Sequence, residues 1–118
     1  MDDQQLDMQA LEEMTNPAEV AAVGTTLERL TDDAEVLLFI GQGCPACPHQ
    51  VRSVATLALA SPKVSVEIVD ARQEPDMAED YGISAVPTTV INDELIMVGV
   101  IPATDIALRL LERVREIN

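Results

Sequence analysis

The spacing of hydrophobic residues predicts two helices before residue 35. Residues 3–14 carry apolar side chains at helical intervals. A second helix is predicted to start at Asn16, because Asn16 can cap it, Pro17 suits the first helical position and Glu19 completes a capping box. Its apolar side chains form one stripe, made of Val20, Val23, Leu27 and Leu30. The stripe favours packing against a core, and docking of a partner is the alternative.

From residue 36 onward, short apolar runs alternate with helical patterns. Val36–Ile40 is a continuous apolar run, which is typical of a buried parallel strand. Residues 47–60 are rich in Ala, Leu and Val and predict a helix, and Val64–Val69 predicts a second strand. Because a helix joins these two strands, we expect them to be parallel.

The rest of the chain predicts a short helix, a hairpin and a final helix. Pro75–Tyr81 predicts the short helix, and Thr88–Ile91 with Leu95–Val100 predicts an antiparallel hairpin. The final amphipathic helix begins near Pro102, and its apolar positions are Ile106, Leu110, Val114 and Ile117. The order after residue 35 is β-α-β-α-β-β-α. The predicted fold class is therefore α/β, with helices on both faces of a mixed sheet.

Length and composition limit the remaining choices. The chain has 118 residues, of which 47% are hydrophobic, so one domain with one packed core is expected. No apolar run approaches the ~18 residues that span a membrane. The first residues lack the basic start and apolar stretch of a signal peptide, which predicts a cytoplasmic protein. In that compartment thiols are kept reduced, so a disulfide there is catalytic or transient rather than structural.

The charge of the chain excludes two classes of partner. The formal net charge is −14, and residues 1–35 contribute −9 of it through ten acidic residues and one arginine. Nucleic acids and anionic membranes would repel such a chain, so neither is an expected partner.

The chemistry gathers in the stretch IGQGCPACPHQV, which holds both cysteines and the only histidine. Cys44 follows the buried strand where a helix begins, and the free N–H groups there favour a thiolate. Three residues further on, Cys47 is near enough to close a disulfide. This predicts a redox couple in which the Cys44 thiolate attacks a partner disulfide and Cys47 resolves the mixed disulfide.

A metal site is the weaker interpretation of the same residues. Structural zinc generally takes four Cys or His ligands, often from two paired motifs. This chain offers two cysteines and His49, which lies only two residues past Cys47. We therefore predict no metal and no cofactor, and keep metal binding as a minority alternative.

A second stretch, YGISAVPTT, places Pro87 43 residues after Cys44. With the C-x-x-C motif it resembles the thioredoxin-like superfamily over about residues 34–116. Within that superfamily, the chain is most similar to the redox-active half of the N-terminal domain of the alkyl hydroperoxide reductase flavoprotein subunit and to the glutaredoxin-like units of protein disulfide oxidoreductases. The resemblance implies a thioredoxin-like domain at 34–118 and an acidic helical extension at 1–33.

The resemblance also implies a set of site residues. Cys44 would be the attacking thiol, Cys47 the resolving thiol and Pro87 a cis-proline. The partner groove would be formed by Pro45, Ala46, Val86, Pro87 and Thr88.

The chain departs from thioredoxin proper at several positions, one of which is the pair between the cysteines, Pro45-Ala46 in place of Gly-Pro. Gly43 replaces the tryptophan before the first cysteine, Leu38 replaces a buried acid, and Val66 stands near the position of its lysine partner. Proton transfer at Cys47 would then rely on water or another carboxylate. No basic residue is apparent beside either motif, which disfavours a dedicated glutathione enzyme.

These observations predict a thiol–disulfide oxidoreductase, acting as a reductase or electron relay. Its partners would be a protein that carries a disulfide and a reductase or flavoprotein that donates electrons. A non-enzymatic module for binding, assembly or redox sensing is the alternative, and the oligomeric state stays open.

Overall fold

The computed structural model describes residues 15–117, with side chains as far as Glu112. The helix predicted at residues 3–14 lies outside this range. The described elements follow one another in the order α2 (Pro17–Leu27), β1 (Ala34–Ile40), α3 (Cys47–Ala60), β2 (Val64–Asp70), α4 (Pro75–Asp80), β3 (Thr88–Ile91), β4 (Leu95–Val98) and α5 (Ala103–Ile117). After α2, this is the predicted β-α-β-α-β-β-α order.

The four strands form one mixed sheet in the order β2-β1-β3-β4. β1 and β2 are parallel and β3 and β4 are antiparallel, as predicted, while β1 and β3 are also antiparallel. β1 starts at Ala34, two residues earlier than predicted, because Ala34 pairs with Val64 in the parallel ladder. β4 ends at Val98, two residues earlier than predicted, and Gly99 follows with a φ of 100°.

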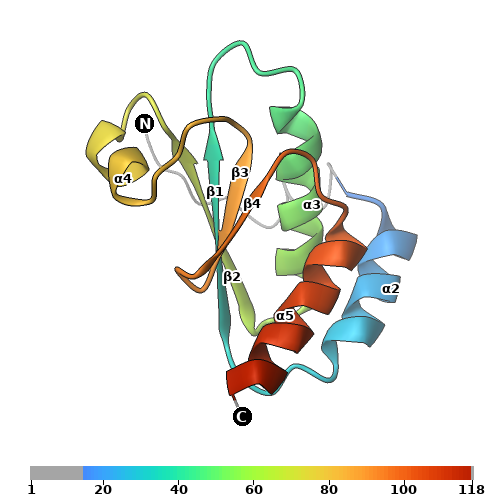
Figure 1. Ribbon diagram of the computed structural model, residues 1–118. Coiled ribbons are helices and arrows are strands. Elements are labelled where there is room, and N and C mark those ends of the chain that lie inside the picture. Colours follow the sequence, from blue (N-terminus) through green and yellow to red (C-terminus); the bar gives the residue numbers. More distant parts are fainter. Residues whose placement is uncertain (1–14, 118) are drawn as a thin grey trace.

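Helices cover both faces of the sheet (Figure 1). α2, α3 and α5 lie on one face, and the short α4 lies on the other. The larger core sits under the three helices, and its fully buried side chains include Val23, Leu38, Val54, Leu57, Ile91 and Ile106. A smaller core around Phe39 and Val90 sits under α4. None of the helices in the described part of the chain is long and apolar enough to cross a membrane.

The predicted stripe of α2 packs into the larger core. Val23, Leu27 and Leu30 are at most 2% exposed and share that core with β1, whereas Val20 is half-buried. α2 begins as predicted, because Asn16 Oδ1 accepts hydrogen bonds from the backbone of the first turn. The interpretation of the stripe as core packing is confirmed for these three residues.

Candidate functional site: the disulfide of Cys44 and Cys47

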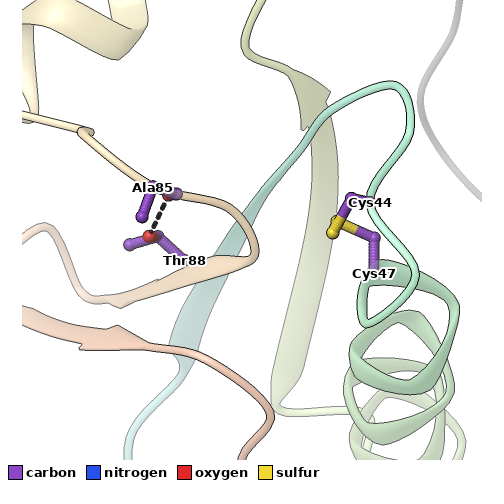
Figure 2. Close-up of a disulfide and its surroundings, with 4 residues drawn as sticks. All are labelled: Cys44, Cys47, Ala85 and Thr88. Atoms are coloured by element: carbon purple, nitrogen blue, oxygen red, sulfur yellow. Dashed lines mark hydrogen bonds between the residues drawn. A yellow bond between two sulfur atoms is a disulfide. The ribbon is translucent and has the colours of Figure 1, made fainter.

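The two cysteines lie where the central strand passes into a helix. β1 ends at Ile40, and the loop that follows carries Cys44 to the start of α3, whose first residue is Cys47. The two sulfur atoms form a disulfide, with their Cα atoms 5.4 Å apart (Figure 2). The pair is unequally accessible, since Cys44 is half-buried and Cys47 is only 5% exposed. A partner can therefore reach Cys44 more readily than Cys47.

The local sequence determines how this loop enters the helix. Gly43 has a φ of 70°, in the left-handed region that favours glycine. The Cys47 amide then donates to the Cys44 carbonyl at 3.3 Å and closes the turn. Pro48 occupies the first turn of α3, where a missing N–H costs no helical bond, and Ala46 provides no side-chain cap. The Gln50 amide is bonded to the Ala46 carbonyl in the same turn, so the dipole of α3, rather than a set of free N–H groups, acts on the sulfurs at its N-terminus.

A second loop, just before β3, faces the cysteine loop. The Val86–Pro87 peptide bond is cis, and the Thr88 hydroxyl donates to the Ala85 carbonyl at 2.6 Å across this turn. Figure 2 shows the disulfide on the side of its loop that faces the Ala85–Thr88 turn. The two loops also approach each other closely, because a Cβ added at Gly41 would lie 3.2 Å from Val86 Cγ2. Glycine at position 41 allows this close approach.

The structure brings the predicted site residues into two neighbouring loops. Cys44, Pro45, Ala46 and Cys47 form one, and Val86, Pro87 and Thr88 form the other. Their exposure differs, since Pro45 is exposed while Thr88 is 1% exposed with its hydroxyl bonded inside its own turn. Pro87 is buried as well and Val86 is half-buried, so Val86 is the one of these three residues that a partner reaches most readily.

A pocket of about 490 Å³ opens beside the disulfide. It is lined by Ile40, Gly41, Gly43, Cys44, Cys47, Pro48, Val51 and Arg52. Arg52 is the one charged residue among the described residues of this lining. The expectation of no basic residue beside either motif is therefore wrong for the cysteine motif. Arg52 follows Pro48 by four residues on the helix, and this spacing is the signal that could have revealed it.

A second arginine also contacts the cysteine loop. Arg72 follows β2, and its Nη1 donates to Gln42 Oε1 at 2.9 Å. Gln42 precedes Cys44 by two residues. Thirty residues separate Arg72 from Gln42, and the parallel pairing of β1 with β2 brings them together. No local pattern predicts this contact.

A buried polar side chain lies on the helix that carries Cys47. Gln50 follows Cys47 by one turn and is fully buried, as is the apolar Leu38 on β1. Among the described residues, no carboxylate lines the pocket beside the disulfide. The sequence analysis overlooked Gln50, since a single polar residue in a helix is expected on the exposed face. Within the part of the chain that the structure describes, no group of three or more His, Cys, Asp or Glu side chains could hold a metal ion.

Comparison with known proteins identifies this arrangement. Residues 33–112 match the family model of the thioredoxin domain. The chain belongs to the thioredoxin-domain family. Its thioredoxin domain with a bonded C-x-x-C pair is that of a thiol–disulfide oxidoreductase.

Individual relatives agree with this family. A thioredoxin of Methanocaldococcus jannaschii is 39% identical over 66 residues, which are 55% of this chain and 78% of that protein. The protein disulfide oxidoreductase of Aeropyrum pernix K1 is 26% identical, with a TM-score of 0.68, and the match covers 80% of this chain and 43% of that one.

A third relative shares the fold. The N-terminal NTD_N/C domain of an alkylhydroperoxide reductase from Enterococcus faecalis is 23% identical, with a TM-score of 0.64 over 92% of this chain and 45% of that one. The resemblance drawn from the two sequence motifs is confirmed. This thioredoxin-like chain spans less than half the length of the two structural relatives.

Proposed function

We propose that this protein is a reductase or electron relay that exchanges electrons with the disulfide of a partner protein through Cys44 and Cys47. The observation that carries the proposal is the bonded pair at the start of α3, in which Cys44 is half-buried and Cys47 is buried. Cys44 acts as the attacking thiol because it is the more exposed of the two. The positive end of the α3 dipole, at the start of that helix, favours the Cys44 thiolate.

The reaction moves two electrons in two exchange steps. The Cys44 thiolate attacks one sulfur of the partner disulfide, whose S–S bond breaks, and the partner's other sulfur leaves as a thiolate that takes up a proton. Cys47 then loses its proton and attacks the Cys44 sulfur, which releases the second partner thiol. The partner ends as a dithiol and the pair ends as a disulfide. Because none of the described residues that line the pocket carries a carboxylate, water in the pocket is the acceptor we propose for the Cys47 proton.

The partner segment is proposed to lie between the two loops. Pro45 and Ala46 form one side, and the turn at Val86, Pro87 and Thr88 forms the other. Support comes from the close approach of the two loops at Gly41 and Val86 and from the disulfide that faces this turn. The backbone of Val86, which is half-buried, then provides hydrogen bonds for an extended partner chain.

A reductase or flavoprotein is proposed to return the pair to its dithiol form, in the cytoplasm. This direction of electron flow follows from a compartment that keeps thiols reduced. The measurement that tests it is the reduction potential of the pair, obtained by equilibration in dithiothreitol or glutathione buffers and mass analysis of alkylated thiols. A value near ~−270 mV supports a reductase or relay, and a value near ~−120 mV indicates an oxidant and contradicts the proposal.

Two cysteine variants test the assignment of roles. Cys44→Ser should abolish reduction of a partner disulfide, because the attacking thiol is lost. Cys47→Ser should accumulate a mixed disulfide with the partner, because resolution is lost. Mass spectrometry of the acid-quenched reaction detects the adduct. Full disulfide-reducing activity in Cys44→Ser, or binding of the partner that survives loss of both thiols unchanged, would favour a binding module over the enzyme.

A further inference from the structure

Gln50 is a buried amide one turn after Cys47. It is 0% exposed, and both ends of its side chain are hydrogen bonded. Nε2 donates to Thr89 Oγ1 at 3.0 Å, and Oε1 accepts from the Ile101 amide at 2.7 Å. A buried amide costs free energy unless it is bonded, so these two partners hold the Gln50 side chain in one orientation.

The three bonded residues belong to the three segments that surround the site. Gln50 lies on α3, which begins at Cys47. Thr89 lies on β3, two residues after Pro87, and Ile101 lies in the connection between β4 and α5. Among the described residues, the bond from Gln50 to Thr89 is the side-chain hydrogen bond that joins α3 to β3. It therefore links the helix that carries the resolving cysteine to the strand that leaves the Pro87 turn.

We propose that Gln50 is a positioning residue for disulfide exchange. By tying the first turns of α3 to β3, it sets where the Cys47 sulfur lies relative to Cys44 and to the partner segment at Pro87. Gln50 does not touch the reacting sulfurs and acts through the placement of Cys47. The inference rests on the proposed redox function of the cysteine pair.

The link matters most when the disulfide is open. In the oxidised protein, the S–S bond itself holds the cysteine loop to α3. In the mixed disulfide that bond is absent, and the rate of the Cys47 attack depends on how well the two sulfurs are held in an attack geometry. Loss of the link should therefore slow resolution. It should also make the disulfide easier to reduce, because the two cysteines are then held less well in the position in which their S–S bond forms.

The experiment follows the two exchange steps separately in reduced protein. One equivalent of dithiobis(nitrobenzoate) releases a first coloured thiolate when Cys44 attacks and a second when Cys47 resolves the adduct. The variants that remove the link are Gln50→Leu and Thr89→Val, and Thr89→Ser keeps the hydroxyl. The matched control is Thr56→Val. Thr56 is also a buried threonine, but its hydroxyl bonds to the Arg52 carbonyl within α3 and does not reach β3.

Gln50→Leu and Thr89→Val should slow the second release roughly tenfold and leave the first unchanged. Because the Cys44–Cys47 disulfide closes less readily in these variants, the reduction potential of the pair should become about 30 mV less negative. Thr89→Ser and Thr56→Val should behave as the wild type. The variant that carries both Gln50→Leu and Thr89→Val should be no slower than Gln50→Leu alone, since Gln50→Leu already removes the bond that Thr89→Val breaks.

Several outcomes would overturn the positioning role. The positioning role fails if Gln50→Leu and Thr89→Val lower the melting temperature but leave the rate of the second release and the reduction potential of the cysteine pair as in the wild type. Gln50 would then have a structural role only. If Gln50→Leu does not fold, the comparison of Thr89→Val with Thr89→Ser decides the question. A wild-type protein that shows the first release but no second release contradicts the proposed function itself, and the positioning role fails with it.

Discussion

Tyr81 is the residue whose titration the structure most clearly alters. Its hydroxyl donates to Asp93 Oδ1 at 2.6 Å, and its ring packs against Phe39 with the ring centroids 5.6 Å apart. The hydrogen bond to Asp93 raises the pKa of Tyr81 to about 12, and burial and the Asp93 charge act in the same direction. A phenolate would lose this bond and be repelled by the carboxylate.

We predict that ultraviolet titration of the folded protein will show Tyr81 ionising near pH 12. Tyr81 is the only tyrosine and the chain has no tryptophan, so the signal is unambiguous. Asp93→Asn should lower the midpoint towards ~10. Since the folded pKa is raised, the stabilisation by this pair is complete below pH ~10 and is lost as the pH rises through the folded pKa. Equal midpoints in both proteins would contradict this assignment.

At the scale of elements, α2 belongs to the same core as the sheet. Leu27 is 2% exposed and packs in the core that α3, α5 and β1 also form. The sequence analysis assigned residues 1–33 to an extension of the domain. The packing of α2 predicts instead that this part of the extension is needed for the stability of the domain.

Leu27→Ala should therefore destabilise the protein by ~2–5 kcal/mol, the usual cost of removing a buried leucine side chain. Chemical denaturation measures this loss. The matched control is Leu108→Ala on α5, because Leu108 is 52% exposed and should cost much less. If both variants unfold at the same denaturant concentration as the wild type, α2 is a dispensable extension.

At the scale of the whole molecule, the charge near the cysteines differs from the charge of the chain. The chain carries −14, yet Arg52 lines the pocket beside the disulfide and Arg72 contacts the cysteine loop. The long-range field of the protein repels anions, while these two arginines attract them at the site. We therefore predict that a partner disulfide that carries carboxylates reacts faster at this site than a neutral one.

Arg52→Ala should lower the rate of reaction with an anionic disulfide relative to a neutral one. The rate with dithiobis(nitrobenzoate) divided by the rate with hydroxyethyl disulfide should fall roughly two- to fivefold, as expected for one exposed charge. Arg109→Ala on α5 removes the same charge away from the pocket and is the matched control. If Arg109→Ala lowered this ratio of rates equally, the effect would be due to the net charge of the protein and not to the position of Arg52.

The sequence by itself determined the elements and the central chemistry. Apolar runs, turn residues and helix caps act over a few neighbouring residues, so Val36–Ile40, Asn16 and the hairpin near Asn92 could be recognised directly. The C-x-x-C spacing likewise brings two sulfurs within bonding reach through local geometry alone.

Only the tertiary structure decided which distant side chains meet at the site. Gly41 lies close to Val86, Arg72 reaches Gln42, and Gln50 is bonded to Thr89 and Ile101. Each of these contacts joins segments at least 30 residues apart. They depend on the order of strands in the sheet and on how α3 lies against it, which no local pattern encodes.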